Sequence, residues 1–177
     1  EGDAAFAVAL AEGASQIINQ TIARTAPGIL VESTATPTQP KIYFAGGARV
    51  EKLGLVGKLV TPETPAHPGD ILSLYAVGLG PTDPPIPDGQ SAPEAANTLL
   101  APSVSLGDVS CPVLYSGLEP GQVGVYRVDF ILCAPQGAET LLPIKLTVDG
   151  NDSETVNLPA AAPAPSASSS SNKDEEG

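Results

Sequence analysis

The chain has 177 residues, among them 19 Pro and 18 Gly, which favour many short strands and turns over a few long helices. Its 20 Asp and Glu outnumber 8 Lys and Arg, and the formal charge of -12 disfavours nucleic acid and anionic membrane surfaces as partners. No apolar run of about 18 residues occurs, so no membrane insertion is expected. With 42% apolar residues but three Phe, four Tyr and no Trp, the composition predicts an aliphatic core in an all-β domain.

Strands are predicted wherever β-favouring residues lie between turn signals. In chain order they are residues 5–10, 16–23, 29–32, 41–44, 48–52, 58–60, 71–77, 103–106, 111–115, 123–132, 141–148 and 154–158. Alternation of apolar and polar residues is clearest at residues 126–132, and Asp149-Gly150 predicts a hairpin turn. Two sheets packed face to face would bury these apolar rows together. The prediction for residues 27–158 is therefore an Ig-like antiparallel β-sandwich.

The first 26 residues predict a terminal strand pair. Their pattern is similar to that of residues 144–158, with alternating apolar residues, an acidic residue beside Gly, a second strand and an Ala/Pro exit. The plainer interpretation is that any two hairpins share such a pattern. The sharper hypothesis is that residues 1–26 complete a sheet of a neighbouring domain or subunit, with a strand-exchange contact made by Phe6, Val8 and Leu10.

The two ends of the chain carry little fold information. Residues 159–177 predict a disordered tail or linker, because Pro, Ala, Ser and acidic residues cannot bury enough apolar surface. A stalk holding an extracellular domain away from a cell surface is one interpretation, and a plain disordered terminus is the other. The chain begins at Glu1 without Met, from which we expect a mature or excised segment.

Five sequence blocks follow one another along the predicted sandwich. They are TAPGIL (residues 25–30), PAHPGDILSLYAVGLGP (65–81), PPIPDGQSAP (84–93), VLYSGLEPGQVGVYRVDF (113–130) and LTVDG (146–150). In these blocks the chain resembles the Ig-like C-terminal β-sandwich domain of secreted proteins from soil Acidobacteria such as Solibacter, over about residues 25–158. The resemblance implies a secreted, non-catalytic module at the end of a large extracellular protein, and it leaves the activity open.

The two cysteines are candidates for a disulfide. Cys111 and Cys133 flank two strands joined through residues 117–124, a spacing that can bring them opposite each other in an antiparallel pair. The even number of Cys and the secreted context implied by the resemblance favour a bond between them. Two free buried thiols are the alternative. A zinc site would need further ligands, and His67 alone does not complete one.

Few residues form a pattern with catalytic or metal-binding chemistry. His67 is the only histidine, and no Gly-x-Ser-x-Gly motif accompanies it, so we interpret it as a solvated turn residue and expect no enzyme. Gly57-Lys58 lacks the rest of a phosphate-binding loop. Asp83 and Asp88 lie in a Pro-rich loop and are candidate calcium ligands, with turn-capping aspartates as the alternative. No cofactor is expected.

The leading functional interpretation is a non-catalytic structural or adhesive module, secreted or on the cell surface. Its expected partners are other copies of the chain or neighbouring domains, and strand complementation would build a filament. The alternative is a carbohydrate-binding accessory domain of a larger extracellular enzyme, with a polysaccharide as partner. Sugars stack on aromatic faces, so an exposed planar strip would favour that alternative. The aromatic residues concerned are Tyr43, Phe44, Tyr75, Tyr115 and Tyr126.

Two N-glycosylation motifs complete the candidates. They begin at Asn19 and Asn151, and the second motif continues through Asp152 and Ser153. Such motifs arise often by chance, and they matter only in a host that attaches glycans to them. A bacterial origin would make both irrelevant.

Overall fold

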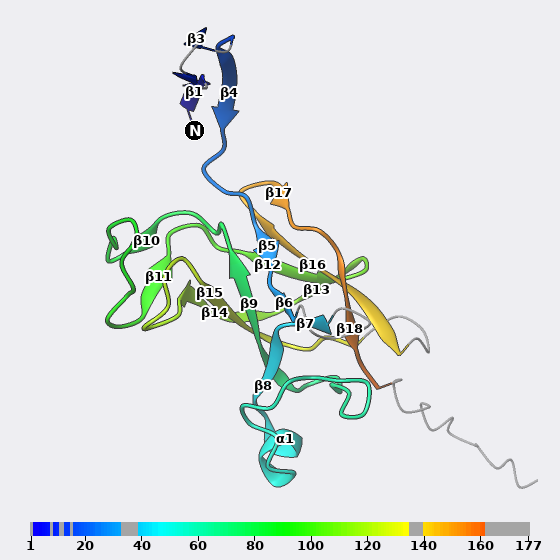
Figure 1. Ribbon diagram of the computed structural model, residues 1–177. Helices are drawn as coiled ribbons and strands as arrows, with labels where there is room; N and C mark the ends of the chain where they lie inside the picture. The colour runs from blue at the N-terminus through cyan, green and yellow to red at the C-terminus, as the bar shows by residue number, and fades with distance from the viewer. Residues whose placement is uncertain are drawn as a thin grey trace, which may run out of the picture.

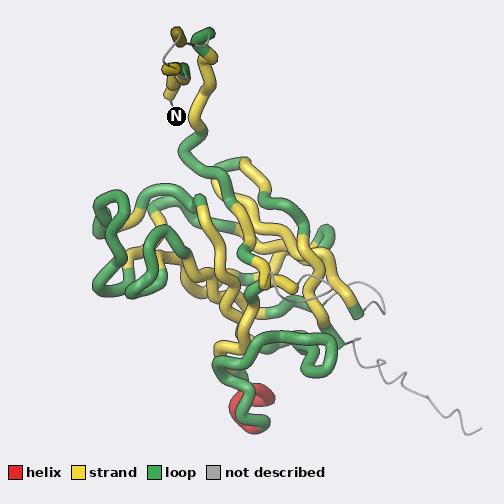
Figure 2. Tube along the Cα trace, in the orientation of Figure 1, coloured by secondary structure: helices red, strands yellow, loops and turns green. Residues whose placement is uncertain are grey.

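The computed structural model describes residues 2–7, 9–10, 13–14, 16–32, 39–134 and 140–161 (Figure 1). These residues fold into antiparallel sheets with one short helix, and Figure 2 shows strands and loops along almost the whole trace. The predicted all-β fold is therefore confirmed. Residues 162–177, which make up most of the predicted tail, lie outside the described residues.

The larger sheet has seven strands, with β9 (Ile71–Val77) and β15 (Tyr126–Ile131) paired at its centre. The strand order is β10 (Thr82–Asp83), β11 (Ala96–Thr98), β14 (Val113–Leu118), β15, β9 and β5 (Gly28–Ile29), and β8 (Ile42–Gly46) also pairs with β9. β5 pairs with one end of β9 and β8 with the other. One edge of the sheet is thus shared by two short strands.

The smaller sheet has five strands and is organised around β16 (Leu141–Val148). The order is β13 (Val109–Cys111), β12 (Ser103–Leu106), β16 and β17 (Asn151–Asp152), and β18 (Val156–Pro159) pairs with the other half of β16. Asp149 and Gly150 have φ angles of 50° and 77°, as a two-residue type I′ hairpin requires. The predicted turn between β16 and β17 is confirmed.

The core lies between the two sheets and is built from alternate residues of their strands. On β15, Val128 and Phe130 are fully buried, and on β16 Ile144 and Leu146 are fully buried against the same cluster. The residues between them on each strand are half-buried or face solvent. The predicted inner faces of residues 126–132 and 144–148 are therefore correct.

Three two-stranded sheets lie outside this sandwich. They pair β1 (Gly2–Phe6) with β4 (Ile18–Ile22), β2 (Ala9–Leu10) with β3 (Gly13–Ala14), and β6 (Val31–Glu32) with β7 (Gln39–Pro40). The predicted single strand at residues 5–10 is wrong, because β1 ends at Phe6 and β2 begins at Ala9 in a different sheet. The predicted strand at residues 29–32 is likewise divided between β5 and β6.

The predicted strand at residues 48–52 is wrong, because these residues form helix α1 (Ala48–Lys52). Gly47 precedes the helix with a φ of 108°, and its carbonyl accepts a hydrogen bond from the Glu51 N–H over 2.9 Å. Val50 is the one buried residue of the helix, a pattern that fits a helical turn as well as a strand. Ala, Arg, Glu and Lys are strong helix formers, so local propensity decides the outcome.

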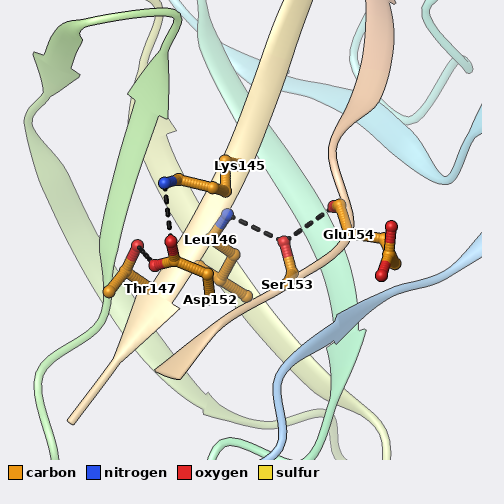
Figure 3. A network of polar contacts seen from close by, with 6 residues as sticks. All are labelled: Lys145, Leu146, Thr147, Asp152, Ser153 and Glu154. Carbon is orange, nitrogen blue, oxygen red and sulfur yellow. Dashed lines mark hydrogen bonds and ion pairs between the residues drawn. The ribbon is translucent and has the colours of Figure 1, made fainter. Parts of the chain in front are cut away.

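The residues after the β16–β17 turn are held by a network of side-chain contacts (Figure 3). Lys145 Nζ lies 2.7 Å from Asp152 Oδ2, and the Thr147 hydroxyl donates to Asp152 Oδ1 over 2.7 Å. The hydrogen bonds from Lys145 and Thr147 lower the pKa of the Asp152 carboxyl. Ser153 is buried, and its hydroxyl accepts from the Leu146 N–H over 3.0 Å. This network fixes the path from β17 to β18.

Candidate functional site

The N-terminal hairpin projects from one end of the sandwich (Figure 1). In the described part of the chain, β1 and β4 pair only with each other, with Phe6 opposite Ile18 and Gly2 opposite Ile22. Ile18 is 64% exposed and Ile22 is 52% exposed. The two isoleucines are four residues apart on one strand and so share a face. An isolated two-stranded hairpin is marginally stable in water, and the core clusters of the described residues include none of its side chains.

The predicted strand-exchange contact is divided between two strands, β1 and β2. Phe6 ends β1, Leu10 lies in β2 opposite Gly13, and Val8 lies outside the described residues. The three residues therefore do not line one continuous strand. The sequence does not reveal that the isoleucines of β4 are exposed, because large apolar residues on a strand are normally expected to be buried.

Thr25 connects the hairpin to the sandwich through two hydrogen bonds of its hydroxyl. Its side chain is buried, its hydroxyl donates to the Val148 carbonyl over 3.2 Å, and it accepts from Asn151 Nδ2 over 2.8 Å. The next residue, Ala26, donates its N–H to the Gly78 carbonyl over 2.9 Å. The point where the hairpin leaves the sandwich is therefore fixed by bonds to both sheets.

The glycines of the GLGP block make room for this crossing. Gly78 has a φ of 73°, and a Cβ added to it would lie 2.0 Å from the Ala26 carbonyl oxygen. Gly80 packs against Thr25, and its carbonyl accepts from the Tyr126 hydroxyl over 2.6 Å. Four of the five sequence blocks named above thus meet at the place where the hairpin enters.

A groove of about 540 Å³ crosses the outer face of the seven-stranded sheet. Its floor comes from β8, β9 and β15, and its walls come from the loop after α1 and from the β14–β15 hairpin. The lining residues include Lys41, Tyr43, Ser73, Tyr75, Glu119, Gln122 and Arg127. This volume falls within the range of about 300–1,000 Å³ that is usual for small-molecule sites.

Strand register brings polar and aromatic residues of this face into one row across four strands. Tyr43, Ser73, Asp129 and Tyr115 are successive neighbours across β8, β9, β15 and β14. The Ser73 hydroxyl donates to Asp129 Oδ1 over 2.6 Å. Tyr43 and Tyr75 meet edge to face, with ring centroids 5.6 Å apart and planes at 89°. The groove therefore has an aromatic corner at one side and a polar floor.

Arg127 is the central cation of the groove. Its Nη1 donates to Glu119 Oε2 over 3.0 Å, and its Nε lies 3.3 Å from Asp129 Oδ1 at an angle that makes no hydrogen bond. The guanidinium lies 4.8 Å from the centroid of the Tyr115 ring. Burial raises the pKa of the Tyr75 and Tyr115 hydroxyls. The positive charge is thus balanced by two carboxylates.

The five aromatic residues named from the sequence do not form a planar strip. Phe44 is 1% exposed in the core, and the Tyr126 hydroxyl is turned toward Gly80. Tyr115 lies across Gly117, whose added Cβ would be 2.4 Å from the tyrosine hydroxyl oxygen. Tyr43, Phe44 and Tyr75 contribute to the groove lining, and the rings of Tyr43 and Tyr75 are perpendicular. Alternation along residues 126–132 predicts that Arg127 faces outward, and the structure places it in the lining of the groove.

The disulfide predicted between Cys111 and Cys133 is confirmed. The structure bonds the two sulfurs, with the Cα atoms 5.1 Å apart and a sequence separation of 22. The bond links the end of β13 to the segment just after β15, and so connects the two sheets at their margin. Cys111 is buried beside the main core.

The remaining candidates occupy turns and exposed positions. His67 lies in a turn, where its N–H donates to Asp70 Oδ2 over 2.8 Å, and Gly57 lies in the turn after α1. Asp83 ends β10 and Asp88 lies in the next turn, both exposed. Among the described residues, no three His, Cys, Asp or Glu side chains gather as metal ligands. Calcium binding at Asp83 and Asp88 stays a prediction.

No protein-family model, curated protein or solved structure matches this chain. The described residues contain no helix long and apolar enough to span a membrane. The resemblance to the acidobacterial secreted domain stays a prediction, carried by the sequence blocks that meet around Thr25.

Proposed function

We propose that this protein is a secreted, non-catalytic structural or adhesive module that assembles through its N-terminal hairpin. The single observation that carries the proposal is the exposure of Ile18 and Ile22 on a hairpin that stands apart from the sandwich. Among residues 2–24, none of those whose burial the structure describes is buried. Burying two isoleucines against a partner would stabilise a hairpin that is marginal alone.

The sandwich does not depend on this hairpin for its core. The residues of the main buried cluster run from Ile42 to Ala160. The hairpin is therefore available to a neighbour, and β-strand addition supplies main-chain hydrogen bonds together with apolar contacts. When such a contact repeats head to tail, its symmetry is open and the product is a filament. The disulfide is compatible with an extracellular location.

Charge reversal on the apolar face of β4 tests the proposal. The double variant Ile18→Asp and Ile22→Asp should remain monomeric where the unchanged chain forms higher-order species, as measured by light scattering and electron microscopy. Leu99→Asp is the matched control, since Leu99 is 61% exposed on the sandwich and should leave assembly intact. Deletion of residues 1–22 should also abolish assembly without unfolding the sandwich. A double variant that assembles like the unchanged chain would contradict the proposal.

A second candidate is the carbohydrate-binding accessory domain, and the groove is the observation that favours it. Two tyrosines, an arginine and acidic and amide side chains line one depression on the outer face of the sheet. Perpendicular rings do not suit the flat ribbon of a crystalline polysaccharide, which needs coplanar aromatic faces. They suit a shorter stretch of sugar that enters the groove.

A further inference from the structure

The corner made by Tyr43 and Tyr75 determines the shape of ligand that the groove accepts. The two rings meet at 89°, so a ligand resting on the face of one ring touches the edge of the other. A pyranose ring has this amphipathic form, with C–H groups on its faces and hydroxyls around its rim. A ligand with an apolar face and a polar rim is therefore favoured over a purely apolar one.

Arg127 and Glu119 place donors and acceptors side by side beside this corner. They are joined by a 3.0 Å hydrogen bond, and both line the groove together with Gln122. Neighbouring sugar hydroxyls each donate and accept a hydrogen bond, so a guanidinium next to a carboxylate can engage two of them at once. The Tyr115 ring under the guanidinium limits its movement, which lowers the entropic cost of binding.

The charges of the groove are already paired. Arg127 lies beside Glu119 and Asp129, and Lys41 lies 3.9 Å from Glu32. A charged ligand would have to compete with these ion pairs, and it would gain no uncompensated partner. A neutral ligand keeps every pair intact. The charge balance therefore points away from phosphates, uronic acids and amino sugars.

We infer that this groove binds a neutral hexopyranose unit, stacked in the Tyr43–Tyr75 corner and hydrogen-bonded by Arg127, Glu119 and Gln122. The inference rests on the second proposed function and adds to it the class of sugar and the residues that select it. It is independent of the hairpin, because none of the hairpin's described residues lines the groove.

Saturation-transfer NMR with the full chain tests the inference, because it observes the ligand and tolerates large assemblies. The probes are the methyl glycosides of glucose, galactose and mannose, with glucuronate and glucosamine as charged counterparts. At least one neutral glycoside should bind with a dissociation constant on the order of 1 mM. Glucuronate and glucosamine should bind at least about tenfold more weakly.

Variants assign the binding to the groove. Tyr43→Leu and Gln122→Ala should each weaken binding by about tenfold, and Tyr126→Phe is the matched control outside the groove that should leave it unchanged. Gln122 is exposed, so its variant folds even where a tyrosine variant does not. Absence of saturation transfer to every sugar at about 50 mM would overturn both this inference and the second proposed function. Preferred binding of glucuronate or glucosamine would overturn the inference alone.

Discussion

The side-chain amide of Asn151 donates a 2.8 Å hydrogen bond to the hydroxyl of Thr25, across 126 residues of sequence. Thr25 is the first buried residue after the hairpin, and Asn151 opens strand β17 at the far end of the chain. Their contact ties the entry of the chain to the smaller sheet, while Ala26 is tied to the larger one. The orientation of the hairpin therefore depends on a polar contact between the two termini of the sandwich.

Replacing Thr25 by Val should destabilise the sandwich by about 1–3 kcal/mol, because the new side chain keeps the volume and loses two hydrogen bonds. The Val148 carbonyl and the Asn151 amide both lose their contact with Thr25. Urea denaturation measures the effect. Thr140→Val, at an exposed threonine, should cost little. An equal loss of unfolding free energy in Thr25→Val and Thr140→Val would show that the hydrogen bonds of Thr25 do not stabilise the sandwich.

Gly78→Ala should cost at least about 3 kcal/mol, since the added methyl meets a backbone carbonyl and the residue keeps a left-handed conformation. A Cβ at this position would lie 2.0 Å from the Ala26 carbonyl oxygen, and the residue has a φ of 73°. Gly121→Ala is a matched control, with a φ of 77° and no atom within 4 Å of its Cβ. Its cost should be about 1–2 kcal/mol. A smaller effect at Gly78 than at Gly121 would refute the close crossing.

Removing the disulfide by the double substitution Cys111→Ser and Cys133→Ser should lower the free energy of unfolding by about 3 kcal/mol, as expected for a closed loop of 22 residues. Stability falls mainly because the unfolded chain gains conformational entropy when the cross-link is removed. Mass spectrometry of unreduced, denatured protein provides the direct check. Recovery of two alkylated cysteines under those conditions would mean that the bond is absent.

Phe130→Ala should cost about 3–5 kcal/mol, because Phe130 is fully buried between the sheets. Alternation along β15 places Asp129 on the opposite face of the strand, where a substitution would be expected to cost little. Asp129 is nevertheless a poor control, because its carboxylate accepts a hydrogen bond from the Ser73 hydroxyl and lies beside Arg127. Leu114→Ala on β14 is better, because Leu114 is 55% exposed. Denaturation midpoints that fall equally would mean that the strand register is wrong.

The lowered pKa of Asp152 gives the sandwich a defined response to acid. Its ionised form is favoured in the folded state by Lys145 and Thr147, so its contribution to stability is present above its ordinary pKa of 3.8. That contribution is lost as the pH falls through the lower folded-state value. The stability difference between the unchanged chain and Asp152→Asn should therefore be constant near neutral pH and shrink below about pH 4. Thr147→Val should move the loss to higher pH. A difference that does not vary with pH would contradict this account.

Local signals predicted the sandwich well where one face of a strand is buried and the other is not. The alternation around Val128 and Phe130 set the inner face, and Asp149-Gly150 has the positive φ angles that a tight hairpin demands. The same rule failed at Val50, where a single buried residue fits helix and strand equally. Strands β10 and β11 were also missed, because ladders of two or three residues form only beside a neighbouring strand.

The candidate site was less accessible from sequence, because it depends on which strands become neighbours. The row of Tyr43, Ser73 and Asp129 spans three strands that are distant in the chain, and no local pattern gives their register. The hydrogen bond between Thr25 and Asn151 is equally hidden, because these residues are 126 positions apart in the sequence. Composition indicates that aromatic residues are few, and only the pairing of β8, β9 and β15 shows that Tyr43, Phe44 and Tyr75 line one groove.

The hydrogen bond made by Asn151 affects the N-glycosylation motif that begins at this residue. Its amide nitrogen, the atom to which a glycan would be attached, is bonded to Thr25. The following Asp152 carboxylate is held by Lys145 and Thr147, and the Ser153 hydroxyl is buried in contact with Leu146. Asn151 is exposed, so an enzyme that meets the folded chain would have to break this hydrogen bond before it could modify the asparagine. In a host with such an enzyme, attachment at Asn151 would compete with folding, whereas Asn19 on the exposed strand β4 would stay open to it.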